Sequence, residues 1–184
     1  AKTIVYGILY GMGPDKLGDA IGVHPEKAKG YIETLVDPDT ALGQWQAGQL
    51  ELALRRGYAE TVLGHRRYLQ FVEPKYGQKK GSEGWWRANW RARNRIINHP
   101  VQGSAADVMC VAMLQVSKSL KKHFKDAWLL LQVHDELVVE CDEADGERVY
   151  DCVKWCMEEA GRKLFPSVPL TVEGGVAKTW AEAK

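Results

Sequence analysis

Two apolar runs that flank a short polar step dominate the pattern in the second half of the chain. Residues 129–133 and 137–139 are rich in Leu and Val, and His134, Asp135 and Glu136 separate them. Such runs predict two antiparallel strands joined by a tight turn. A carboxylate held at that turn beside a second carboxylate suits a divalent cation such as Mg²⁺. Taken alone, Asp135 is more simply a turn-forming residue, and this alternative stays open.

Helical periodicity accounts for most of the remaining chain. This periodicity, with proline at helix starts and Gly57 at a helix end, predicts helices over about 2–10, from Pro14, over 25–36, after Asp39 through Arg56, and over 85–124 and 143–164. A kink or a break is expected at Pro100. Residues 58–63 and 66–72 predict a second hairpin, and 169–174 predict a final strand that returns to the sheet. We therefore expect an α+β fold, mostly helical with a small antiparallel sheet.

Lys2, Tyr6 and Tyr10 recur every four residues, so they share one face of the first expected helix. That face offers a cation for a phosphate and flat rings for a base or a sugar. An amphipathic helix whose tyrosines belong to the core is the alternative, and the pattern alone favours it.

Charge changes this picture in one segment. The 184-residue chain has a net charge of +1, yet residues 75–95 carry seven basic residues against Glu83 alone. Trp85, Trp86 and Trp90 are interleaved with them. A basic face with aromatic residues suits a polyanion, although a merely solvated basic helix is nearly as good an explanation.

The four cysteines show no disulfide framework, and we expect neither a signal peptide nor a membrane-spanning run. A reducing compartment is therefore expected. Cys152 and Cys156 lie one helical turn apart, but small buried apolar residues explain them better than a metal site does.

Four motifs follow one another in the order typical of one enzyme family. They are Lys-x-x-x-Tyr-x-x-x-Tyr-Gly at 2–11, Thr61-x-x-Gly64-x-Arg66-Arg67, Asn98-x-Pro-x-Gln102-Gly-Ser-Ala-Ala-Asp107 and Gln132-Val-His134-Asp135-Glu136-Leu. Together they resemble the C-terminal fingers and palm portion of family A (DNA polymerase I-like) DNA polymerases. The resemblance covers essentially the whole chain. It implies a fingers-like region at 1–98 and a palm-like region at 99–184, the latter ending in a helix and a strand.

The resemblance implies template-directed transfer of nucleotides from dNTPs to a primer 3′-hydroxyl, with two Mg²⁺ ions in the complete site. Lys2 would meet the triphosphate as a point charge. Tyr6 would lie beside the sugar, and Tyr10 would hold the position of the template base. Asp135 would bind metal, and Glu136 would be a weaker or outer ligand. Lys2, Asp135 and Glu136 are thus the expected catalytic residues.

The same resemblance implies contacts to primer-template DNA. Asn98 and Gln102 would read minor-groove acceptors, which are nearly the same for every correct base pair. Arg66, Arg67 and His134 would hold the primer and template backbones. A bacterial or phage-infected cytoplasm, or another reducing compartment that contains DNA, is the expected location, without a membrane partner.

Two departures from the family pattern stand out. The family has Arg four residues before Asn98, whereas this chain has Asn94 between Arg93 and Arg95, so that role stays unassigned. The segment that bears the tryptophans also looks longer than in common bacterial relatives, and it has no assigned function.

No stretch resembles the upstream palm motif that carries the family's other catalytic aspartate. We expect a split polymerase, inactive as this chain alone and completed by a second polypeptide with that carboxylate and the thumb. Ala1, as a residue exposed by removal of an initiator Met, supports this weakly, and a truncated fragment explains the absence about as well. A non-catalytic DNA-binding or accessory subunit with a polymerase-like fold is the alternative.

Overall fold

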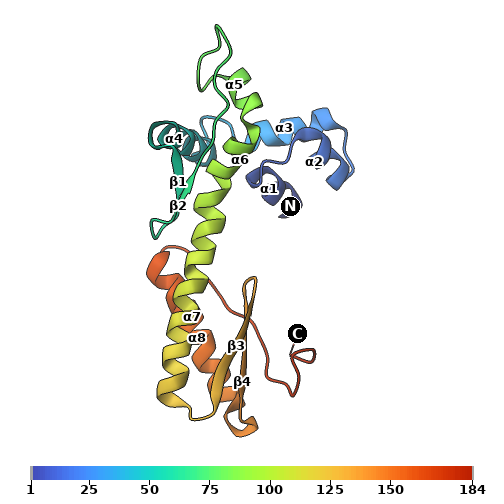
Figure 1. Cartoon of the computed structure of the whole chain (residues 1–184). Coiled ribbons are helices and arrows are strands. Elements are labelled where there is room, and N and C mark those ends of the chain that lie inside the picture. The colour runs from blue at the N-terminus through green and yellow to red at the C-terminus, as the bar shows by residue number, and fades with distance from the viewer. Residues whose placement is uncertain (1, 184) are drawn as a thin grey trace. The chain divides into compact units, whose positions relative to one another are not determined.

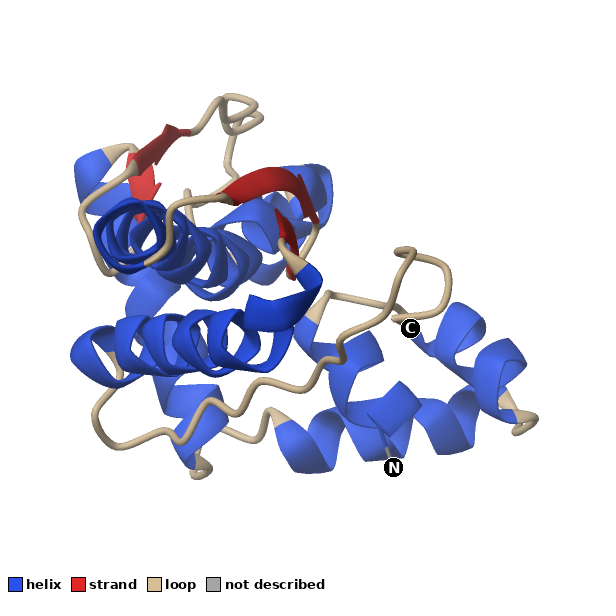
Figure 2. Ribbon diagram, turned by 90° about the horizontal axis from the view of Figure 1, so that it is seen from below, coloured by secondary structure: helices blue, strands red, loops and turns tan. Residues whose placement is uncertain are grey.

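The structure, a computed structural model, describes residues 2–183 and divides the chain into two compact units, Ala1–Ser104 and Ala105–Lys184 (Figure 1). Each unit contains helices and a two-stranded antiparallel sheet of its own, which agrees with the expected α+β class (Figure 2). The assignment of residues 1–98 to fingers and 99–184 to palm stays a prediction.

Three short helices begin the first unit and share one small core. They are α1 (Lys2–Leu9), α2 (Pro14–Ile21) and α3 (Pro25–Leu35). Pro14 and Pro25 occupy first-turn positions where no N–H is needed. Ile8, Leu17 and Ala28 are buried together, one from each helix. Burial of these apolar faces, more than helix propensity, stabilises such short helices.

The rest of the first unit consists of α4 (Ala41–Arg56), β1 (Tyr58–Glu60), β2 (Arg66–Tyr68), α5 (Glu83–Ala88), α6 (Trp90–Asn98) and a π-helix (His99–Gly103). The Thr40 hydroxyl caps α4 by accepting from the Gly43 N–H at 3.0 Å. Gly57 ends α4 with a φ of +78°, a conformation that glycine adopts without steric cost. Strands β1 and β2 pair antiparallel, with Tyr58 opposite Tyr68 and Glu60 opposite Arg66.

The helix expected to begin at Trp85 has an additional break, because Asn89 interrupts it between α5 and α6. The Asn89 side chain is buried and binds the backbone of Val72, so a contact distant in sequence places this break. The interruption expected at Pro100 is confirmed and takes the form of the π-helix.

The second unit contains most of α7 (Ser104–His123), then β3 (Ala127–Val133), β4 (Glu136–Cys141), a 3₁₀ turn (Glu143–Asp145) and α8 (Gly146–Leu164). Its core cluster joins both helices to one face of the hairpin and contains Val116, Leu120, Ala127, Val149 and Cys156. The four cysteines are free, and Cys156 lies in this core as expected.

The prediction of a final strand at 169–174 is wrong. Residues 165–183 contain neither helix nor strand, and both described sheets have two strands. The Val172 N–H donates to the Glu158 carboxylate of α8 at 3.1 Å, and Leu170 packs against Gly161 of α8. This segment therefore pairs with a helix, although its alternating apolar residues resemble a strand.

Among residues 2–183, no helix combines the length and apolarity that a membrane crossing requires.

Candidate functional site

Tyr6 lies on the exposed face of α1, and Tyr10 directly follows the last residue of this helix, Leu9. Their rings stack with centroids 6.2 Å apart and planes inclined by 20°. Tyr6 is 52% exposed and Tyr10 is 47% exposed, so these rings do not belong to the core. The opposite face of α1 supplies Ile8 to the core instead. The side chain of Lys2 lies outside the described part of the chain, so its contact with a phosphate stays a prediction.

A pocket of about 320 Å³ lies where α6 meets the π-helix. Three predicted DNA-binding residues line it: Arg67 from β2, Asn98 from the end of α6 and Gln102 from the π-helix. Asn94, Arg95, His99 and Gly103 complete the wall. The pocket therefore combines amide groups, which both donate and accept hydrogen bonds, with two guanidinium groups.

The π-helix follows from Pro100. Proline has no N–H to donate, and its ring would meet the carbonyl group four residues earlier in an α-helix. The wider π-helical turn over His99–Gly103 avoids both the missing hydrogen bond and the steric clash. Such π-helical segments are frequent at functional sites. Asn98 and Gln102 flank Pro100 and both face the pocket.

The turn between β1 and β2 is fastened to this segment by three contacts. The Val62 N–H donates to the buried Ser104 hydroxyl at 2.9 Å, and His99 Nε2 donates to the His65 carbonyl oxygen at 3.2 Å. Gly103 lies so close to Thr61 that an added Cβ would come within 2.5 Å of its methyl group. These contacts position the hairpin that carries Arg67.

Arg66 and Arg67 occupy different surroundings, although the sequence predicts one role for both. The Arg66 guanidinium donates to the Glu60 carboxylate at 3.1 Å and lies 4.7 Å from the centre of the Tyr58 ring. The hydrogen bond to Glu60 raises the pKa of this guanidinium. Arg67 instead lines the pocket.

The two arginines beside Asn94 are also distinct. Arg95 is exposed and lines the pocket, whereas Arg93 is half-buried, and this burial lowers the pKa of its guanidinium. Arg95 is therefore the cation that this stretch of α6 supplies to the pocket.

Side chains of α6 contact the turn that ends α1. Asn98 Nδ2 donates to the Tyr10 carbonyl oxygen at 3.5 Å, which makes a weak hydrogen bond. Gly11 has a φ of +74°, and an added Cβ there would lie 2.6 Å from Cγ of Asn94. The motifs at 2–11 and 61–67 thus both contact residues 98–104 of the third motif, all within the first unit.

The fourth motif forms the turn of the β3–β4 hairpin, as expected. Val133 pairs with Glu136, which leaves His134 and Asp135 as the two turn residues, and all three polar side chains from 134 to 136 are exposed. His134 has a φ of +57°, which is uncommon for a residue with a Cβ. Its carbonyl oxygen accepts a hydrogen bond from the Gln132 side chain.

The donor set at this turn fits a divalent ion only in part. Asp135 and Glu136 are adjacent carboxylates, and Mg²⁺ uses one or two carboxylates with water and substrate phosphates. Across residues 2–183, no group of three or more His, Cys, Asp or Glu side chains is arranged to hold a metal ion. A complete site needs further oxygen ligands.

Sequence reasoning missed His99 and Gly103 as part of the pocket and left Asn94 without a role. Only the folded structure reveals these residues, because His99 contacts His65 and Asn94 lies beside Gly11, and both partners are distant in sequence. The adjacent Pro100 was the one local indication that this segment departs from an ordinary helix.

Comparison with known proteins identifies the class. The sequence profile of DNA polymerase family A matches residues 1–182. The chain therefore belongs to DNA polymerase family A, which confirms the resemblance seen in the sequence.

Curated relatives include a thermostable DNA polymerase I of Thermus filiformis, 38% identical over 185 residues, and one of Thermus aquaticus, 36% identical over the same length. Each alignment covers 100% of this chain and 20% of the relative, so the chain spans about a fifth of their length. A solved structure of the POL domain of Pol1 from M. smegmatis, in complex with DNA primer-template and dNTP, matches with a TM-score of 0.79 and 32% identity. That match covers 99% of this chain and 30% of the other.

Proposed function

We propose that this chain forms the nucleotide- and primer-template-binding part of a DNA polymerase that copies a template from dNTPs. The observation that carries the proposal is the meeting of three motifs around α6 and the π-helix, where the pocket lies beside the end of α1. The M. smegmatis relative was solved with primer-template DNA and dNTP, which supports the same ligands here.

In this proposal α1 receives the incoming nucleotide. Lys2 attracts its triphosphate, and the stacked, exposed rings of Tyr6 and Tyr10 offer flat surfaces to the sugar and the template base. The amides of Asn98 and Gln102 donate to minor-groove acceptors, which test the geometry of a base pair without reading its sequence. Arg67 and Arg95 neutralise nearby phosphates.

Asp135 and Glu136 are the residues of this chain that would hold the divalent ions. When bound, such ions lower the pKa of a primer 3′-hydroxyl and stabilise charge on the departing pyrophosphate. The exposed hairpin turn presents both carboxylates to solvent, and His134 beside them offers a donor for a backbone phosphate.

A segment outside these 184 residues completes the site, either as a separate polypeptide or as another part of a longer chain. The hairpin supports this, because its inner face packs on α7 and α8 while Trp128 and Leu130 are each about half exposed. An apolar sheet face of this kind suits a covering partner. The completing segment would supply the further carboxylate that Asp135 and Glu136 lack.

A non-catalytic DNA-binding or accessory role is the second candidate. It is favoured because, within residues 2–183, no group of three or more His, Cys, Asp or Glu side chains is arranged to hold a metal ion. Both candidates bind DNA through the same pocket, and they differ in whether Asp135 affects synthesis.

Primer-template binding by the pocket variants Asn98→Ala and Gln102→Ala tests the shared part of the proposal. Each loss of a hydrogen bond should weaken binding by about 1 kcal/mol, or about fivefold. Gln44→Ala, an exposed amide of α4, is the matched control and should bind like the parent chain. Equal affinity of all four proteins for primer-template DNA would contradict the proposed role of the pocket.

A further inference from the structure

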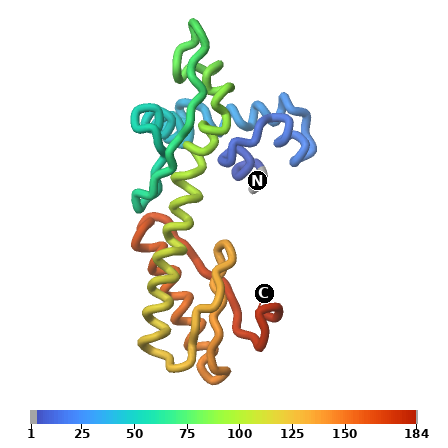
Figure 3. The backbone as a smooth tube through the Cα atoms, in the orientation of Figure 1, coloured from blue at the N-terminus to red at the C-terminus, as the bar shows by residue number. Residues whose placement is uncertain are grey.

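The loop between β2 and α5 is fixed at its base by buried side chains (Figure 3, green). The Val72 N–H donates to Asn89 Oδ1 at 2.7 Å, and the Val72 carbonyl oxygen accepts from Trp85 Nε1 at 3.0 Å. Trp85 and Asn89 are both almost fully buried. Phe71 packs against the Trp85 ring with centroids 5.3 Å apart. The loop therefore extends from a well-defined anchor within the first unit.

Beyond this anchor the chain turns tightly and exposes an aromatic ring. The Gln78 N–H donates to the Lys75 carbonyl oxygen at 2.8 Å, and the Lys75 N–H donates to Gln78 Oε1 at 3.2 Å. Gly77 closes the turn with a φ of +73°. Tyr76 lies within the turn, and its side chain is fully exposed. An ordered turn that presents a free aromatic face to solvent contributes nothing to the core, so folding does not explain it.

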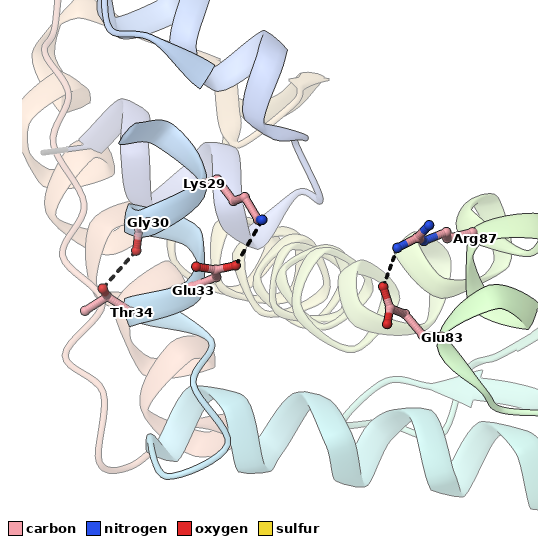
Figure 4. A network of polar contacts seen from close by, with 6 residues as sticks. All are labelled: Lys29, Gly30, Glu33, Thr34, Glu83 and Arg87. Carbon is pink, nitrogen blue, oxygen red and sulfur yellow. Dashed lines mark hydrogen bonds and ion pairs between the residues drawn. The ribbon is translucent and has the colours of Figure 1, made fainter. Parts of the chain in front are cut away.

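Basic residues flank Tyr76 in the sequence. Residues 75–80 contain Lys75, Lys79 and Lys80 and no acidic residue. The following Glu83 is paired with Arg87 at 2.5 Å, as Figure 4 shows. Within residues 2–183, neither Lys75 nor Lys79 forms an ion pair with a carboxylate. Lys80 lies 5.6 Å from the centre of the Phe71 ring, so its charge is held near the anchored base of the loop.

We propose that residues 75–80 form a binding site for single-stranded nucleic acid. Tyr76 stacks on an unpaired base, and Lys75 and Lys79 contact the flanking phosphates. Stacking and charge together are the recognised basis of sequence-independent single-strand binding. A duplex keeps its bases stacked on one another, so it could use the lysines but not the exposed ring. An unpaired strand is therefore the ligand that uses both features.

This inference rests on the proposed function only for the source of the strand, which is the unpaired template ahead of a primer end. The pocket on α6 does not include this segment. The loop thus adds a second contact to nucleic acid beyond the primer-template contact.

Binding of a dye-labelled oligothymidylate of about ten nucleotides to the 184-residue chain tests the proposal by fluorescence anisotropy. Tyr76→Ala should weaken binding about tenfold, and Tyr76→Phe, which keeps the ring, should bind like the parent chain. The double variant K75A/K79A should reduce the slope of log Kd against the logarithm of the salt concentration by about 1.4, since each single-strand phosphate contact contributes about 0.7 to this slope. K16A/K27A, with the same charge change on exposed helix positions, is the matched control and should alter neither quantity.

Equal affinities of Tyr76→Ala and Tyr76→Phe would overturn the stacking contact, and equal effects of the two lysine pairs would overturn the site. If Tyr76→Ala weakened binding to blunt duplex DNA as much as binding to the single strand, the proposed single-strand site would also be overturned, and the result would indicate a duplex contact. The two proposals fail separately, because Asn98→Ala and Gln102→Ala report on the primer-template pocket and Tyr76→Ala reports on the loop. Thermal unfolding followed by circular dichroism verifies that each variant is folded.

Discussion

At the scale of single residues, His134 combines a costly backbone conformation with an exposed, functional position. Its φ of +57° places a Cβ in the left-handed region, where most residues lose about 1 kcal/mol or more. Such outliers persist where the surrounding structure holds them, and they cluster at functional sites. The β3–β4 pairing on both sides of the turn provides that constraint.

We expect His134→Gly to be more stable than His134→Ala by about 1 kcal/mol, because only glycine accepts this φ without strain. Both variants lose the imidazole, so the comparison isolates the backbone. Urea unfolding of the two variants measures the difference. A His134→Ala variant as stable as His134→Gly would show that the turn is not strained.

Individual contact residues show how far sequence reasoning reaches. The family resemblance implies DNA contacts for Asn98, Gln102 and Arg67, and these three residues line one pocket. The resemblance implies the same role for Arg66 as for Arg67, yet Arg66 pairs with Glu60 within its own hairpin. Neighbours in sequence point in opposite directions from a strand, and only the strand pairing shows which side each one faces.

At the scale of elements, the π-helix and the β1–β2 turn act as one fitted pair. Gly103 allows the close approach, since an added Cβ would meet the buried Thr61 and lie 3.1 Å from Cε1 of His99. Gly48 in the middle of α4 provides the opposite case, because an added Cβ there meets nothing within 4 Å.

Gly103→Ala should therefore reduce the free energy of unfolding by about 1–3 kcal/mol through overpacking. Gly48→Ala should increase it by about 1 kcal/mol, because alanine favours a helix over glycine. Denaturant titration of both variants tests this contrast. Equal tolerance of the two substitutions would refute the close fit between the turn and the π-helix.

Most elements could be predicted because their boundaries are local. Pro14, Pro25 and Gly57 mark helix ends through their own backbone preferences, and the polar step at 134–135 marks a hairpin turn. The break at Asn89 and the missing strand at 169–174 depend on distant partners instead, namely Val72 and Glu158. No local pattern encodes those contacts.

At the scale of the whole molecule, the chain consists of two compact units. It spans about a fifth of the length of its curated relatives. The first unit gathers three motifs around one pocket, and the second presents Asp135 and Glu136 at a hairpin turn. In the proposed enzyme these units contribute different parts of one reaction, and a further segment supplies the remaining metal ligands.

Primer extension with Mg²⁺ tests this account most directly. The chain is assayed alone and together with the polypeptide encoded next to it, and chelation of the metal provides the blank. We expect extension only in the combined reaction, lost to background in Asp135→Ala and retained in Asp151→Ala, an exposed carboxylate of α8. DNA binding without extension in the combined reaction would contradict a site completed by that polypeptide, and extension that Asp135→Ala leaves unchanged would contradict a polymerase site built on this hairpin.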